Sequence, residues 1–218
     1  MCQHFGVNSL RVLGLLGAVV AGLWSLPLAA EAGAQPCPDV QVLFARGTNE
    51  PPGVGIVGQS FADALSTKVS GRSVTVSAVD YPASDNYLSS AANGSDDAQA
   101  QIQNVVANCP STKLVLGGYS QGAAVTDMAT AALPAQVADR VAAVALFGTP
   151  ASGFSSMLAG GTPLPTTSPA YAAKTIDLCI DGDPICSAGA NMIAHVSYVQ
   201  SGMTDQAASF AAAKIDQH

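Results

Sequence analysis

The residues with the clearest potential for chemistry form a short serine motif flanked by glycines. Gly118, Ser120 and Gly122 give the pattern G-x-S-x-G. The apolar run 114–116 before it predicts a buried strand, and the alanine-rich segment 123–133 after it, free of Gly and Pro, predicts a helix. A serine on a tight strand-to-helix turn presents its hydroxyl at the C-terminal edge of a sheet. The context therefore predicts a nucleophilic serine on such a turn.

A nucleophilic serine needs a base and a group that stabilises negative charge. The chain has three histidines, of which His4 lies near the N-terminus and His218 is the last residue. His195 is therefore the candidate base, expected in a loop after the last strand. Gln121 follows the serine, and its N–H at the start of the predicted helix is placed to stabilise an oxyanion.

The carboxylate that orients the histidine is expected between the serine and the histidine if the chain order is Ser, Asp, His. Asp177, Asp181 and Asp183 are the candidates. Asp177 falls within a predicted strand, whereas the other two lie in a turn between Cys179 and Cys186. A disulfide around that turn would hold a carboxylate in place. We favour Asp183, although the spacing alone leaves Asp181 open.

The N-terminus has the pattern of a secretory signal peptide. Arg11 precedes the apolar stretch 12–26, and an A-x-A cleavage signature ends at Ala32. A retained membrane anchor is the alternative, but glycines and a proline interrupt the stretch and it is short for a bilayer span. We expect residues 1–32 to be removed, with Ala34 as a competing cleavage position.

The remaining residues, 33–218, are expected to form a single domain. Their length suits one α/β domain with a real core. The formal net charge of the whole chain is -7, with 8 basic residues and no basic cluster, so nucleic acid is not an expected partner. Cys2 would leave with the signal peptide, and the even number of cysteines that remain in an exported chain predicts two disulfides, with three pairings open. No Cys/His cluster has zinc spacing, so no metal is expected.

Short apolar strands alternate with helices along this domain. Strands are expected at 39–45, 73–79, 114–116, 140–147 and 175–180, and helices at 57–69, 96–108, 123–133 and 203–215. The segments 80–95 and 151–171 are expected to be loops. The first is polar, and the second is irregular with one turn of helix. The alternation predicts an α/β fold, a parallel sheet covered by helices on both faces.

These pieces together resemble the cutinase family of serine esterases, and look closest to the cutinase-like proteins exported by mycobacteria and related actinobacteria. The resemblance rests on Arg-Gly-Thr ending at Thr48, on G-G-Y-S-Q-G at 117–122, on Asp183 between two cysteines, and on His195. It spans the chain from about Cys37 to the end. The six-residue motif with an aspartate between two cysteines is more specific than G-x-S-x-G alone.

The resemblance implies a role for each residue of the site. Ser120 would be the nucleophile, Asp183 the acid and His195 the base. The N–H groups of Thr48 and Gln121 would form the oxyanion hole. No cofactor is implied.

The resemblance also implies the support of this site. Asn86 would support the oxyanion residue, and the disulfides would be Cys37–Cys109 and Cys179–Cys186. The implied fold is a three-layer α/β/α sandwich of the α/β-hydrolase type, with a five-stranded parallel sheet and no large lid.

The implied function is a secreted carboxylic-ester hydrolase that acts on short- to medium-chain acyl esters through an acyl-enzyme. Its partners would be small-molecule or lipid ester substrates, and it would contact a lipid interface. No obligate protein partner is expected. Retention on the cell envelope is a further expectation. The apolar residues expected to line the substrate pocket are Leu88, Ile185, Met192 and Ile193. The alternatives are an acetylxylan-type carbohydrate esterase and a non-enzymatic exported surface protein that retains the fold.

Overall fold

A five-stranded parallel sheet organises residues 36–164 and 166–217, the part of the chain that this computed structural model describes. The strands, in the order β2-β1-β3-β4-β5, are β1 (Val40–Ala45), β2 (Val74–Ala78), β3 (Lys113–Tyr119), β4 (Val141–Phe147) and β5 (Thr175–Leu178). All four strand pairs are parallel, as the sequence predicted. The expected signal peptide, residues 1–32, lies outside the described residues.

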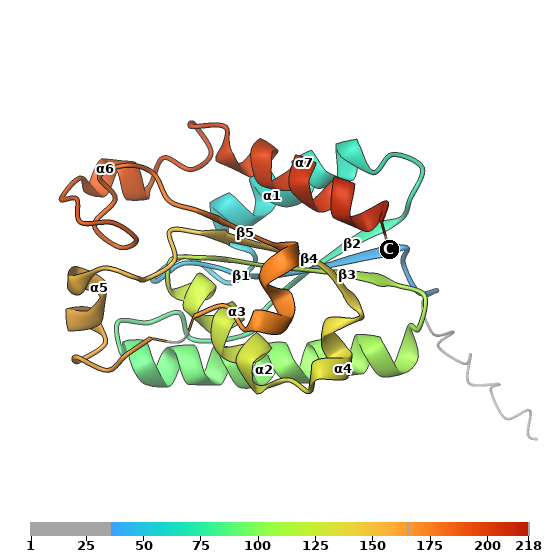
Figure 1. The fold of residues 1–218 in the computed structure, drawn as a ribbon, viewed down its shortest axis with the longest axis horizontal. Helices are drawn as coiled ribbons and strands as arrows, with labels where there is room; N and C mark the ends of the chain where they lie inside the picture. The colour runs from blue at the N-terminus through green and yellow to red at the C-terminus, as the bar shows by residue number, and fades with distance from the viewer. Residues whose placement is uncertain (1–35, 165, 218) are drawn as a thin grey trace, which may run out of the picture. The chain divides into compact units, whose positions relative to one another are not determined.

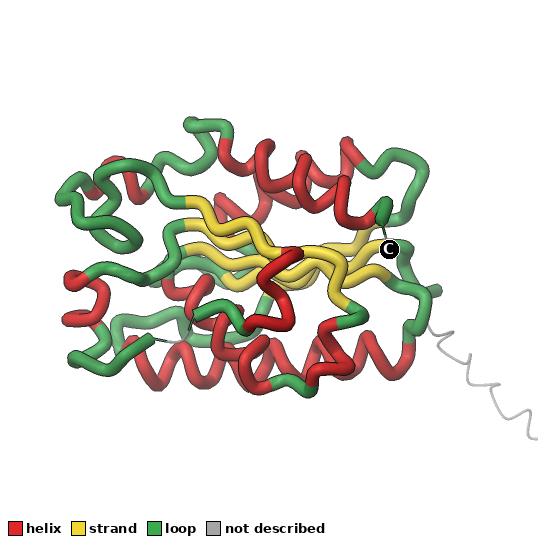
Figure 2. The backbone as a smooth tube through the Cα atoms, viewed as in Figure 1, coloured by secondary structure: helices red, strands yellow, loops and turns green. Residues whose placement is uncertain are grey.

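Helices cover both faces of the sheet, which gives three layers (Figure 1, Figure 2). Helices α1 (Gly55–Lys68) and α7 (Met203–Ile215) pack on one face, and α2 (Tyr87–Asn108) and α3 (Gln121–Ala132) pack on the other. Phe44 of β1 points to the α1 and α7 layer, and its neighbour Leu43 points to the α2 and α3 layer. The central strands are therefore apolar on both sides.

Helix α2 is nine residues longer at its N-terminus than expected. The segment 80–95 was expected to be a polar loop, but its second half forms the start of this helix, which begins at Tyr87. Serine, asparagine and glycine in this stretch are poor helix formers, but their small side chains let α2 approach α3 closely. A Cβ atom on Gly94 would lie 2.8 Å from Cγ2 of Val125. Packing between the two helices thus overrides local propensity.

Short helices occupy the two loops beside the C-terminal edge of the sheet. The irregular loop 151–171, where the sequence predicted one turn of helix, contains α5 (Gly153–Leu158) and the start of a 3-10 helix, η1 (Pro169–Lys174). The loop expected around His195 contains α6 (Met192–His195). A further short helix is α4 (Ala135–Ala138). Side-chain caps fix both edge helices. Ser152 Oγ accepts the N–H of Ser155 at 3.0 Å, and Asn191 Oδ1 accepts the N–H of Ile193 at 3.1 Å.

Two disulfides join parts of the domain, and they have the pairing that the resemblance implied. Cys37–Cys109 ties the segment before β1 to the residue after α2, 72 positions apart. Cys179–Cys186 closes a loop of sequence separation 7 just after β5. None of the helices within the described residues is long and apolar enough to cross a membrane.

One carboxyl group is buried in the α3 layer without a full set of partners. Asp127 is 1% exposed. Its Oδ1 accepts a hydrogen bond from Thr167 Oγ1 at 3.0 Å, and its Oδ2 has no hydrogen-bond partner among the described residues. Burial raises the pKa of Asp127 to about 7; the Thr167 hydrogen bond opposes this shift, and the charge of Asp177 adds to it.

This raised pKa predicts a pH-dependent stability. The folded protein holds the proton of Asp127 up to about pH 7, whereas the unfolded chain releases it near the ordinary aspartate pKa of 3.8. Stability therefore falls as pH rises through this window, because the folded state binds more protons there. We expect Asp127→Asn to raise the melting temperature relative to the parent, by more at about pH 8 than at about pH 4.5. A difference that does not change with pH in calorimetric scans would contradict this.

Candidate active site

The turn between β3 and α3 places Ser120 in a strained conformation that close packing sustains. Its φ is 55° and its ψ is -120°, and its N–H donates to the carbonyl of Phe147 in β4 at 2.9 Å. A Cβ on Gly118 would lie 2.1 Å from the carbonyl oxygen of Gly122, and a Cβ on Gly122 would lie 2.0 Å from that of Ala45. Only glycine fits at either position, which explains the spacing of the motif.

A continuous hydrogen-bonded chain runs from this serine into the protein. His195 Nε2 lies 3.0 Å from Ser120 Oγ, and His195 Nδ1 lies 2.8 Å from Oδ2 of Asp183. The histidine is buried and the carboxylate is 0% exposed. The other carboxylate oxygen, Oδ1, accepts the N–H of Ile185 at 2.8 Å. The arrangement can move a proton off the serine while the carboxylate holds the imidazole in one orientation.

The structure separates the three candidate aspartates. Asp183 is the one that contacts the histidine. Asp181 is exposed in the preceding turn. Asp177 lies in β5 and accepts a hydrogen bond from Thr149 Oγ1 at 2.7 Å. The disulfide between Cys179 and Cys186 encloses the turn that carries Asp183, as expected.

Two tyrosines that the sequence reasoning did not identify surround the histidine. The Tyr119 hydroxyl donates to the carbonyl of His195 at 2.7 Å, and its ring stacks on the imidazole with centroids 5.1 Å apart. The Tyr198 hydroxyl donates to Asp183 Oδ2 at 2.7 Å. The sequence could have indicated them by position, since Tyr119 directly precedes the serine and Tyr198 follows the histidine by three residues. Burial is the main cause that raises the pKa of both tyrosines, so both hydroxyls stay protonated.

The residue after the serine is locked by its own side chain. Gln121 is 0% exposed. Its Oε1 accepts the hydroxyl of Ser90 at 3.0 Å, and its Nε2 donates to the carbonyl of Ser84 at 3.0 Å. Both partners belong to the segment around the start of α2. This fixes the first residue of α3, whose backbone N–H is the candidate oxyanion donor.

The loop after β1 places Thr48 at the same cavity as the serine. The buried Arg46 donates to the carbonyls of Glu50 at 2.9 Å and Tyr81 at 2.7 Å. The Glu50 carboxylate in turn accepts the N–H of Gly47 at 2.6 Å. The loop is therefore held from both sides by hydrogen bonds that involve charged groups.

Asn86 was expected to support the oxyanion residue, and the structure gives it a different place. It is exposed at the position before the first residue of α2. Within the described residues, no hydrogen bond joins its side chain to Thr48. The loops are instead linked by Asn49, whose N–H donates to the carbonyl of Ala83 at 2.6 Å and whose side-chain amide donates to Asp85 Oδ1 at 3.0 Å.

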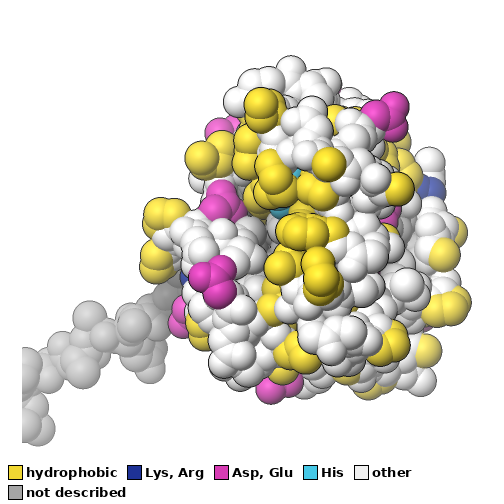
Figure 3. Space-filling model, turned by 90° about the vertical axis from the view of Figure 1, so that its left-hand side faces the viewer, with side chains coloured by type: hydrophobic (Ala, Val, Ile, Leu, Met, Phe, Trp, Pro, Cys, Tyr) yellow, Lys and Arg dark blue, Asp and Glu magenta, His cyan; other side chains and the backbone are white. Residues whose placement is uncertain are grey.

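A cavity of about 420 Å³ lies beside Ser120 and His195. The apolar and aromatic side chains that line it are Tyr87, Tyr119, Pro150, Phe154, Leu158, Ile185, Met192 and Val196. Figure 3 shows hydrophobic side chains gathered around a histidine on this face. Of the four residues expected to line the pocket, Ile185 and Met192 do so. Leu88 and Ile193 are absent from the lining and point outward, being 42% and 74% exposed.

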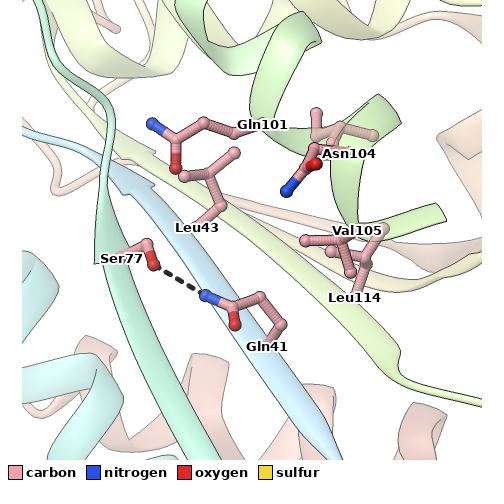
Figure 4. A pocket seen from close by; sticks show the side chains of 8 residues that line it. Gln41, Leu43, Ser77, Gln101, Asn104, Val105 and Leu114 are labelled. Carbon is pink, nitrogen blue, oxygen red and sulfur yellow. Dashed lines mark hydrogen bonds between the residues drawn. The ribbon is translucent and has the colours of Figure 1, made fainter. Parts of the chain in front are cut away.

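A second hollow of about 200 Å³ lies between α2 and strands β1 and β2 (Figure 4). Gln41 Nε2 donates to Ser77 Oγ at 2.8 Å within it. Its lining contains amide, hydroxyl and aliphatic side chains and no ionisable group, so we do not connect it with the serine. Among the described residues, no group of three His, Cys, Asp or Glu side chains could hold a metal ion.

The chain is similar to known proteins in sequence and in fold. Residues 36–215 match the family model "Cutinase". Carboxylesterase Culp1 of Mycobacterium tuberculosis H37Rv is 59% identical over 207 residues, 94% of this chain and 95% of that protein. Phospholipase Culp4 of the same organism is 44% identical over 217 residues, 94% of this chain and 92% of that protein.

Two solved structures are similar in fold and sequence. A Trichoderma reesei cutinase in complex with a phosphonate inhibitor has a TM-score of 0.68 and 39% identity, and the match covers 83% of this chain and 78% of that one. An acetylxylan esterase has a TM-score of 0.71 and 27% identity, and the match covers 83% of this chain and 100% of that one.

Gly148, directly after β4, is the point against which the buried groups of the site pack. Its φ is +62°, a conformation that favours glycine. A Cβ atom there would lie 3.0 Å from Tyr198 Oη, 3.1 Å from His195 Cε1 and 3.3 Å from Asp183 Oδ2. A side chain at this position would therefore displace the histidine and its partners together.

We expect Gly148→Ala to slow the reaction of Ser120 with an organophosphonate by roughly 10-fold to 100-fold, because sub-ångström displacement of the base is costly. The matched control is Gly153→Ala, where a Cβ meets nothing within 4 Å. Labelling rates followed by mass spectrometry measure the effect. Equal rates for Gly148→Ala and the parent would contradict the proposed packing constraint.

Proposed function

The chain belongs to the cutinase family, and from this premise we propose that Ser120, His195 and Asp183 form the catalytic triad of a carboxylic-ester hydrolase. That it is a serine esterase follows from the family and its relatives. The observation that carries the residue assignment is the hydrogen-bonded chain of 3.0 Å and 2.8 Å from the serine through the histidine to the aspartate.

In this mechanism His195 Nε2 accepts the proton of Ser120 Oγ while the oxygen attacks the ester carbonyl carbon. The tetrahedral intermediate collapses when the imidazolium protonates the alkoxide oxygen, so that the alcohol leaves and an acyl-enzyme remains. Water then attacks the acyl-enzyme and gives a proton to the same nitrogen, which returns it to the serine as the carboxylic acid leaves. Asp183 stays ionised and stabilises the imidazolium.

The oxyanion of both tetrahedral intermediates would be held by the N–H groups of Gln121 and Thr48. The hydrogen bonds on the Gln121 side chain support the first assignment, because they fix the residue before substrate arrives. For Thr48 the support comes from the network of Arg46 and Glu50. We assign the support of Thr48 to that network and not to Asn86.

We infer short- to medium-chain acyl esters as substrates. The cavity has a largely apolar wall and a volume within the usual range for small-ligand pockets. Its lining includes one carboxylate side chain, Asp85, and no Lys or Arg. Such a wall suits an acyl chain better than a sugar. The similarity to an acetylxylan esterase keeps a carbohydrate ester as the second candidate.

We also infer that the protein is exported and acts outside the cytoplasm. The support is the signal-peptide pattern of residues 1–32 together with two disulfides in the folded domain. Retention on the cell envelope is part of the same proposal.

We expect the parent to hydrolyse p-nitrophenyl esters with a maximum at short to medium chains, and Ser120→Ala to lose about 10⁴-fold or more of kcat. Rates from acetate to palmitate on correctly oxidised protein measure both. Activity on acetate alone, with release of acetate from acetylated xylan, would favour the carbohydrate esterase. An inert parent that an organophosphate also fails to label would favour a non-enzymatic surface protein.

An exposed apolar rim surrounds the mouth of the cavity, and we propose that it contacts a lipid interface. It consists of Leu88 of α2, Phe154, Met157 and Leu158 of α5, Met192 and Ile193 of α6, and Val196. Met157 and Ile193 are 68% and 74% exposed and do not line the cavity. Exposed apolar side chains gathered around a site mark an interaction surface, and Figure 3 shows hydrophobic side chains gathered around a histidine on one face.

The double variant Met157→Ser and Ile193→Ser should lower hydrolysis of emulsified tributyrin severalfold and leave hydrolysis of dissolved p-nitrophenyl butyrate unchanged. The reason is that it removes surface apolar area without altering the cavity. Val76→Thr, on edge strand β2 and 38% exposed, is the control. An equal loss on both substrates would argue against a lipid contact at the rim.

A further inference from the structure

The carboxylate of Asp183 is shared among three donors. Oδ1 accepts the N–H of Ile185. Oδ2 accepts two hydrogen bonds at almost equal length, from His195 Nδ1 at 2.8 Å and from the Tyr198 hydroxyl at 2.7 Å. The histidine and the tyrosine therefore compete for the same oxygen, the one through which the carboxylate acts on the imidazole.

The nearest acceptor for the Tyr198 hydroxyl is that carboxylate. Asp183 Oδ2 lies 2.7 Å from the hydroxyl oxygen, whereas the disulfide-bonded Sγ of Cys186 lies 3.5 Å away. The side chain is 0% exposed, and its ring packs edge-on against the rings of Phe147 and Tyr119. Burial, and next the hydrogen bond to Asp183, raise the pKa of Tyr198, so its proton stays in place. An ionised carboxylate offers no donor in return. The hydroxyl oxygen also receives the N–H of Ile180 at 3.4 Å.

We propose that Tyr198 is a positioning residue that acts through Asp183: it fixes the carboxylate and limits how strongly that carboxylate favours a positive charge on His195. The proposal rests on the triad roles given above. A carboxylate whose charge is spread over three donors stabilises a neighbouring cation less than one with two donors. His195 would then remain neutral, and competent as a base, to lower pH than without the tyrosine.

No proton leaves Tyr198 at any step of this scheme. When His195 takes the serine proton on Nε2, the hydrogen on Nδ1 and the hydroxyl hydrogen of Tyr198 both remain directed at Oδ2 of Asp183. Among the described residues, the other titratable group in contact with the imidazole is Tyr119, and Glu50 adds to the raised pKa of that tyrosine. Replacing Tyr198 by phenylalanine keeps the ring that packs against Tyr119.

The kinetic test compares two tyrosine-to-phenylalanine variants. Tyr198→Phe should lower kcat/KM for p-nitrophenyl butyrate roughly 10-fold and move the acid limb of its pH profile upward by about 0.5 to 1 unit. Tyr119→Phe is the matched control, since it removes a buried hydroxyl that binds the histidine backbone and not the carboxylate. Its acid limb should coincide with that of the parent, whatever its rate.

A spectroscopic test does not depend on turnover. His195 is the only histidine between positions 36 and 217, so histidine labelled with ¹⁵N gives one interior signal in the full mature chain. Its titration midpoint should rise in Tyr198→Phe. It should fall in Tyr198→3-fluorotyrosine, a nearly isosteric change that makes the phenol a stronger donor and keeps the fold if the phenylalanine variant does not fold.

Unchanged midpoints and acid limbs in these variants would overturn the proposal, even with lower rates or stability, because a buried tyrosine that only fills space would behave in that way. A shift of the phenylalanine variant to lower pH would also overturn it. Failure of the triad assignment is separate: it would appear as retained activity in Ser120→Ala, with the NMR midpoints still reporting on the tyrosine.

Discussion

The strained backbone of Ser120 is the constraint on which the rest of the structure depends. A non-glycine residue at a φ of 55° costs roughly 1 to 3 kcal/mol and persists only where its surroundings leave no alternative. Here β4 accepts the serine N–H, and β1 and α3 approach so closely that the two motif glycines have no room for a Cβ. The parallel register of β1, β3 and β4 therefore holds the serine turn in place as well as forming the core. Rigid strands carry the nucleophile, and the loops beyond their ends carry its partners.

Electrostatic preorganisation is the second layer of this arrangement. The carboxylate of Asp183 is fully buried, which is tolerable because every side of it meets a donor. Arg46 is a second buried charged group, and its guanidinium donates to two backbone carbonyls. These charged groups lie on opposite sides of the serine. Each of the two groups orders its own loop, which must not move during the reaction. The short disulfide between Cys179 and Cys186 closes the base of the loop that carries Asp183.

Much of this was predictable from the sequence. The serine turn, the parallel sheet and helix 203–215 follow from strong local patterns, and α7 has the expected bounds. The early start of α2 did not follow from the sequence, because Gly94 and the nearby serines are poor helix formers on their own. They are helical here because α2 packs closely against α3. The bounds of α5 and the existence of α6 did not follow either, because the Ser152 and Asn191 caps set these short helices and they give no periodic signal. The outward orientation of Leu88 and Ile193, and the contacts of Tyr198, depend on how these turns pack, which spacing cannot reveal.

Because all strands run in one direction, attachment of the protein through a chain end also sets the direction in which the active site faces. Cys37 precedes β1, and α7 runs back from the catalytic edge, so both ends of the described domain lie at the edge where the strands begin (Figure 1). The serine lies at the other edge. A resin, electrode or fusion partner joined at either end would therefore leave the cavity pointing outward. The disulfide to Cys109 makes the N-terminal attachment the firmer of the two, since tension applied there passes through a covalent link to the end of α2 before it reaches β1.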